Sequence, residues 1–151
     1  MPRYSGYLIN FDEEQRADWL REVQEWRGTF SDALSARDWG FKEYEVCLLS
    51  FDGSSIEVAC LGRRGKVVAT AKYRVEFSTF VPLKPLPFEE VERRIGTRFR
   101  SHFIRSTTGR GQRVPPETWL ELVNVVKEAR PESAEAINNL IRLQEASKRE
   151  F

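Results

Sequence analysis

Polar and apolar residues alternate through the middle of the chain, with the period of a half-buried strand. Two runs, 43–51 and 55–61, flank the turn dipeptide Asp52-Gly53 and predict a hairpin. A second turn signal, Gly62–Gly65, leads into a longer alternating run over 67–81. The three runs together predict an antiparallel β-meander.

Prolines follow the last of these runs, at Pro82, Pro85 and Pro87. Because proline has no N–H to donate to a ladder, they predict that the sheet ends there. A further alternating run over 97–105 predicts one more strand, with Phe99 and Phe103 facing inward. After this strand we expect a loop that extends through Arg113.

The N-terminal part of the chain has the helical period instead. Its apolar residues recur at steps of three and four at Trp19, Val23, Trp26, Phe30 and Leu34. This stripe predicts a helix over 10–36. Asn10 and Glu13 are spaced as in a capping box, which satisfies free amides in the first turn of a helix.

Helical spacing also predicts three helices in the second half of the chain. Pro87 opens a short helix that Gly96 ends, and Pro115-Pro116 opens a second that ends near Arg130-Pro131. The last helix begins near Glu132, and nothing ends it before Phe151. We therefore expect residues 1–151 to be the N-terminal part of a longer protein cut within this helix, with a frayed natural end as the alternative.

These elements predict one α+β domain: a curved antiparallel sheet, open or partly closed into a barrel, between N-terminal and C-terminal helices. A length of 151 residues suits one domain, and 40% hydrophobic with 31% charged residues is typical of a globular protein. The chain has no apolar run of roughly 18 residues and no signal peptide, which predicts a cytoplasmic location without a membrane partner. Cys47 and Cys60 are then expected to be reduced core thiols.

Charge adds a candidate partner, because it is concentrated in one segment. Residues 93–113, which we call the basic tract, contain seven arginines, the only histidine and no acidic residue. The formal charge is −4 over 1–45, zero over 46–92, +7 over the tract and −2 over 114–151. The tract includes a glycine-rich turn over 106–111. Guanidinium groups and free amides of this kind bind phosphate, so the tract predicts a nucleic acid, DNA in preference to RNA.

The candidate binding residues form five sets. The arginines expected to hold phosphates are Arg98, Arg100, Arg105, Arg110 and Arg113. The amides of Thr108 to Gly111 are expected to surround one phosphate, and His102 and Gln112 to contact a base. Arg63, Arg64 and Lys66 extend the basic surface, and Trp39 and Phe41 are the candidates for base stacking.

Catalytic motifs are missing from the sequence. A metal-dependent nuclease needs a Glu-x-Lys triplet, but Glu57 is followed by Val58-Ala59. Metal-free phosphodiester cleavage commonly uses two histidines, and His102 is the only one. The chain lacks a phosphate-binding Walker loop, a Gly-x-Ser-x-Gly elbow and the Cys and His clusters of a zinc site. We therefore predict a domain that is not an enzyme and holds no metal or cofactor.

In outline, a β-meander with flanking helices and a basic loop resembles the DNA-reading domains attached to restriction and phage-defence enzymes. This resemblance implies the specificity module of a larger nuclease or defence protein, although fold alone does not imply function. The alternative is a protein–protein interaction or oligomerisation module whose basic tract docks on an acidic surface. An enzyme acting on a phosphorylated small molecule is a third interpretation. In the simplest case the arginines lie on a solvated face or pair with the acidic N-terminal segment.

Overall fold

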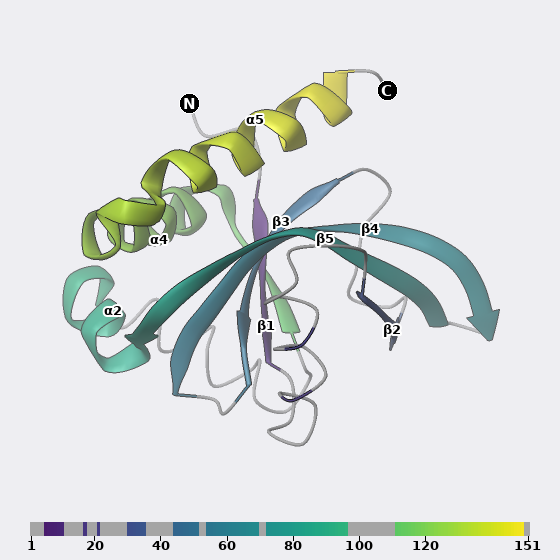
Figure 1. Cartoon of the computed structure of the whole chain (residues 1–151), viewed down its shortest axis with the longest axis horizontal. Coiled ribbons are helices and arrows are strands. Elements are labelled where there is room, and N and C mark those ends of the chain that lie inside the picture. Colours follow the sequence, from purple (N-terminus) through teal and green to yellow (C-terminus); the bar gives the residue numbers. More distant parts are fainter. Residues whose placement is uncertain are drawn as a thin grey trace.

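The computed structural model describes residues 5–10, 17, 21, 30–35, 44–51, 54–69, 72–96 and 111–149. Its strands are β1 (Gly6–Asn10), β2 (Phe30–Ser35), β3 (Glu45–Ser50), β4 (Ser55–Ala69), β5 (Lys72–Pro87) and β6 (Gly111–Val114). Its helices are α2 (Phe88–Ile95), α4 (Pro116–Ala129) and α5 (Ala134–Arg149), with a 3₁₀ turn over Pro131–Ser133. The helices lie together on one side of the sheet (Figure 1).

The strands form one mixed sheet in the order β2-β5-β4-β3-β1-β6. The predicted meander is confirmed, because β3, β4 and β5 are consecutive antiparallel neighbours. β1 runs parallel to β3 and antiparallel to β6. The α+β class is therefore confirmed, with an open sheet in place of a barrel.

The predicted turn at 62–65 is wrong, because this segment lies inside β4. The β4–β5 ladder continues through it, with Gly62 opposite Phe77 and Arg64 opposite Val75. The two strands are thus each longer than expected, and β4 reaches Ala69. Pairing with a long partner strand overrides the local preference of two glycines for a turn.

The prolines do not end the sheet, since β5 continues to Pro87. β2 pairs only with Lys72–Phe77 of β5, so beyond Phe77 the described sheet has β5 at its edge. Proline is tolerated on an edge strand, where its missing N–H faces away from the ladder. Position in the sheet, which the sequence does not reveal, therefore decides the effect of these prolines.

Arg130, the residue after α4, occupies part of this edge. Its Nε donates to the carbonyl of Lys84 and its Nη2 to the carbonyl of Pro85, both at 2.7 Å. Its Nη1 donates to the carbonyl of Ala129 at the end of the helix, also at 2.7 Å. One guanidinium thus satisfies acceptors of both the strand edge and the helix terminus.

The predicted helix over 10–36 is wrong at both ends. Asn10 is the last residue of β1, opposite Ser50, and 30–35 form β2. Positions four apart share a face in a strand as well as in a helix, so Phe30 and Leu34 fit both periods. Ala17 and Arg21 are helical, and the rest of 11–29 lies outside the described residues.

The three helices of the second half are confirmed. Gly96 ends α2 at φ 88°, in the region that favours glycine. Pro116 occupies the first turn of α4, and its predicted apolar face, including Trp119 and Leu122, is buried. Proline and glycine therefore mark helix boundaries reliably here, because each acts through its own backbone geometry.

Both faces of the sheet are buried. The cluster on the helix side contains Leu8, Val46 and Leu48 with side chains of α2, α4 and α5. The cluster on the other face contains Tyr7, Ile9, Cys47, Leu49, Phe51, Val58, Cys60, Phe77 and Phe80. A strand buried on both faces reads as a continuous apolar run, which explains why β1 shows no alternation.

A close contact between Gly6 and Trp119 fixes α4 to the start of β1. A Cβ added at Gly6 would overlap the indole ring of Trp119. Gly6 also pairs with Val114, the last residue of β6, five residues before Trp119 in the chain. After β6 the chain therefore enters α4, and the indole of Trp119 in α4 packs over β1, the strand that pairs with β6.

We predict that Gly6→Ala destabilises the protein by about 1–3 kcal/mol, because the rigid indole must move to admit a methyl group. Urea denaturation measures the change in the free energy of unfolding. Trp119→Phe should recover part of the loss in the Gly6→Ala background, since a smaller ring leaves room for the methyl group. Strictly additive costs in the double variant would contradict this contact.

The C-terminal helix α5 is held by a buried polar network. Gln144 Nε2 donates to Glu45 Oε2 at 2.8 Å and to the carbonyl of Ser5 at 3.0 Å. Lys148 Nζ lies 2.5 Å from Glu45 Oε1. The side chain of Glu45 is 7% exposed and that of Lys148 is 17% exposed. These contacts connect α5 to β3 and to the segment before β1.

We predict that Lys148→Met lowers the free energy of unfolding by about 1–3 kcal/mol, because it removes the charged donor that pairs with the buried carboxylate of Glu45. Arg142→Met on the same helix is the matched control. Arg142 pairs with Glu135 at 3.5 Å, but the two side chains are 63% and 88% exposed. This exposed pair should contribute less than about 0.5 kcal/mol. Equal effects of the two substitutions in urea denaturation would contradict the network's role.

Candidate nucleic-acid interface

The basic tract joins α2 to β6, and the structure describes its two ends. Arg93 and Arg94 are exposed in the last turn of α2. Gly111–Val114 form β6, the outer strand of the sheet beside β1. Residues 97–110 between them lie outside the described residues. Both ends of the tract are thus attached to regular elements of the fold.

The two arginines of α2 differ in their surroundings. Arg94 lies 3.7 Å from Glu90 and 3.4 Å from Glu128, so its charge is partly compensated. Arg93 is exposed and forms no ion pair with another described side chain. Exposed pairs such as those of Arg94 contribute little to stability, so neither arginine is needed for the fold.

The expected loop through Arg113 is wrong for its last residues, which form a strand. Gly111 is opposite Ile9, and Arg113 is opposite Tyr7. β6 is therefore fixed in register against β1, whose Tyr7 and Ile9 are buried. This pairing sets where the preceding part of the tract meets the sheet.

The structure describes only some of the predicted binding residues. Outside the described residues are Arg98, Arg100, His102, Arg105, Thr108, Gly109, Arg110, Trp39 and Phe41, and with them the predicted strand over 97–105. The backbone alone is described for Arg64 and Lys66 in β4 and for Gly111, Gln112 and Arg113 in β6. Arg63 is the one predicted site residue whose side chain is described.

Arg63 is exposed on β4, and its guanidinium carbon lies 5.2 Å from the centroid of the Tyr44 ring. Tyr44 carries no distinguishing signal in the sequence, because it is an isolated aromatic residue just before a strand. The contact is a cation–π interaction, which holds the guanidinium group in place. The sequence therefore identifies the arginine but not its partner.

Arg63 is distant from the start of β6. The ladders connect Gly111 through Ile9 and Leu49 to Val58, so the start of β6 is level with Val58. Arg63 lies five residues further along β4 and three strands across the sheet. At about 3.3 Å per residue and 4.8 Å per strand, the separation is on the order of 20 Å. Arg63 and the start of β6 are therefore not neighbours within the sheet.

Cys47 and Cys60 face each other across β3 and β4 and are both free and buried. Burial, together with the neighbouring Cys60 thiol, raises the pKa of Cys47 well above its ordinary value. A protonated thiol is a poor nucleophile and a poor metal ligand. Among the described residues, no group of three or more His, Cys, Asp or Glu side chains is placed to hold a metal ion.

No helix within the described segments is long and apolar enough to cross a membrane. Comparison of the chain with protein-family models, curated proteins and solved structures finds no match.

Proposed function

We propose that this chain is a nucleic-acid-binding recognition domain that prefers DNA to RNA and acts in the cytoplasm. The observation that supports the proposal is the basic tract, which carries a charge of +7 without an acidic residue and joins α2 to β6. The two attachment points fix where the tract begins and ends on the fold.

The physical basis of binding is charge density. Each arginine that reaches a phosphate releases condensed counterions, and its planar guanidinium can donate two parallel hydrogen bonds. Arg98, Arg100, Arg105, Arg110 and Arg113 supply these contacts in the proposal. His102 and Gln112 then approach base edges, which carry the sequence information that phosphates lack.

The proposed role is recognition without catalysis. In a larger nuclease or phage-defence protein, such a domain would direct a separate effector to its target. The interaction-module alternative uses the same tract, but its partner is an acidic protein surface. Salt-dependent binding of an oligonucleotide separates the two functions.

We predict that a labelled oligonucleotide binds with an affinity that falls steeply as salt rises. If about four arginines reach phosphates, the slope of log affinity against log salt is about −3 to −4. Arg110→Ala and Arg113→Ala should each flatten the slope by about one unit, and the double variant by about two. Fluorescence anisotropy over a salt series measures the slope.

Arg142→Ala is the matched control, because it removes one exposed arginine from α5, outside the tract in the sequence. It should leave the slope unchanged, and the melting temperature should be similar in all variants. An equal loss of affinity in the control would show that overall charge, and not the tract, determines binding. Self-association at low salt without binding to any oligonucleotide would favour the interaction module instead.

A further inference from the structure

A cleft of about 380 Å³ opens between α5 and the β4–β5 ladder. Its volume falls within the range of small-molecule sites. Four hydroxyl-bearing side chains line it: Tyr44, Ser78, Thr79 and Ser147. Arg63 is the only charged side chain among the described residues of the lining. The cleft therefore combines one cation with several neutral hydrogen-bond donors.

Arg63 is held in position at this cleft. Glu76 lies opposite it in the β4–β5 register, yet the guanidinium lies over the Tyr44 ring. A guanidinium uses its face for such a contact, so the N–H groups at its edge stay available to an anion. Because the side chain is already ordered, binding an anion costs less conformational entropy.

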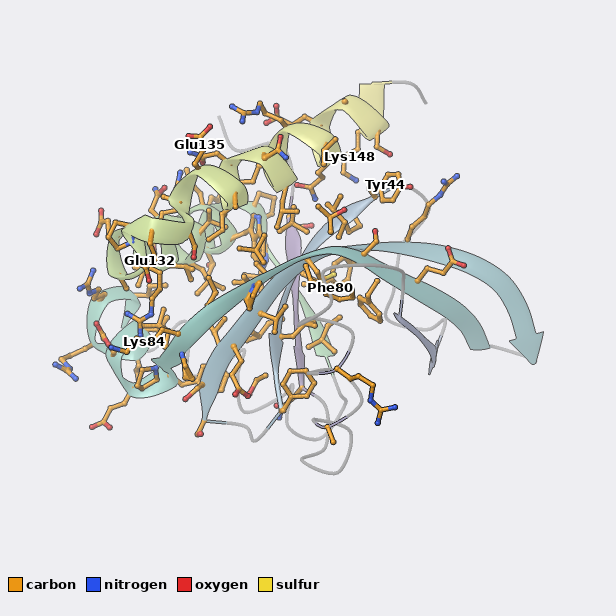
Figure 2. All side chains as sticks on the ribbon, viewed as in Figure 1. Tyr44, Phe80, Lys84, Glu132, Glu135 and Lys148 are labelled. Carbon is orange, nitrogen blue, oxygen red and sulfur yellow. The ribbon has the colours of Figure 1, made fainter. Side chains whose placement is uncertain are left out.

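The other basic side chain beside the cleft is paired. Ser147 Oγ accepts a hydrogen bond from the amide of Tyr44 at 3.1 Å, which fixes this end of α5 to the start of β3. The next residue, Lys148, is paired with the buried Glu45. Figure 2 shows Tyr44 and Lys148 at the same end of α5. Arg63 thus supplies the one positive charge among the described residues of the lining, and Glu76 lies opposite it in the ladder.

Thr79 gives the wall of the cleft an unusual backbone. Residues 78–81 of β5 lie opposite 59–61 of β4, so β5 carries one extra residue at this point. Thr79 has φ 57°, in the left-handed region that β-branched residues rarely adopt. Bulges and strained residues of this kind occur preferentially at functional sites, where they re-aim a side chain. Here the strained residue is exposed and lines the cleft.

The lining also has an apolar part. Leu61 and Leu143 contribute to it, and Leu143 is 41% exposed. An exposed leucine beside hydroxyl groups and an arginine suits a ligand with an anionic head and an organic body. Several hydroxyls together with a guanidinium match the three terminal oxygens of a phosphate monoester better than the two oxygens of a carboxylate.

We infer that this cleft binds a phosphate monoester joined to a body about the size of a nucleoside. Arg63 and the hydroxyls of Ser78, Thr79 and Ser147 contact the phosphate, and Leu61 and Leu143 contact the body. None of the described lining residues belongs to the basic tract. The ligand is either a free nucleotide or the phosphorylated end of a nucleic-acid strand, which share this chemistry.

Isothermal titration calorimetry of the full chain tests the inference with thymidine 5′-monophosphate, thymidine and inorganic phosphate as probes. We expect saturable binding of the monophosphate, at least tenfold tighter than that of thymidine or phosphate alone. Arg63→Ala should weaken it tenfold or more, and Arg63→Lys should weaken it less. Arg142→Ala, which removes an exposed arginine outside the lining, should leave the affinity unchanged. Equal affinities of Arg63→Ala and the parent chain would overturn the inference.

A second variant separates binding from folding. Thr79→Gly relieves the strained backbone and removes one hydroxyl, so it should raise the melting temperature while weakening binding of the monophosphate at least threefold. Retained affinity in this more stable variant would exclude Thr79 from the site.

Oligonucleotides with and without a 5′-phosphate identify the source of the ligand. The chain carrying Arg110→Ala/Arg113→Ala is used, so that the tract contributes less to binding. A gain of tenfold or more from the terminal phosphate assigns the cleft to strand ends, and binding of the free monophosphate alone assigns it to small nucleotides. Failure of both probes overturns the cleft site but leaves the tract untouched. Loss of the salt-dependent binding alone contradicts only the tract.

Discussion

The contact of the Trp119 indole with the backbone of Gly6 determines how α4 packs on the sheet. It brings α4 onto the start of β1. In the sheet, β1 pairs with β6, and β6 is the strand that leads into α4. A side chain on residue 6 would separate the layers at this point. Because β6 ends the basic tract, the same contact fixes where the most highly charged segment of the chain joins the sheet (Figure 1).

The fold was predictable where a residue acts through its own backbone. Pro87, Gly96 and Pro116 mark helix boundaries, and alternation marks the meander, because these signals need no knowledge of neighbours. The sequence was misleading where the conformation of a segment depends on its position in the sheet. Proline within β5 is compatible with an edge, and the four-residue spacing of Phe30 and Leu34 fits a strand as well as a helix.

The two proposed sites depend on different kinds of information. The basic tract is visible in the sequence because its charges are contiguous, and its binding role remains a proposal. The cleft depends on residues that are far apart in the chain, such as Tyr44, Arg63 and Ser147, and only folding brings them together. Of these, the sequence indicated Arg63 alone. A bulge at Thr79 leaves no sequence signal, because its register is set by pairing with β4.

The most direct test of the central claim is hydrogen–deuterium exchange of the chain with and without a saturating DNA oligonucleotide at low salt. If the basic tract binds the phosphate backbone, added protection is concentrated in residues 93–113. The backbone amides of α5 around Arg142 should exchange at an unchanged rate. Protection confined to other segments, while the oligonucleotide is demonstrably bound, would contradict the assignment of the tract as the nucleic-acid interface.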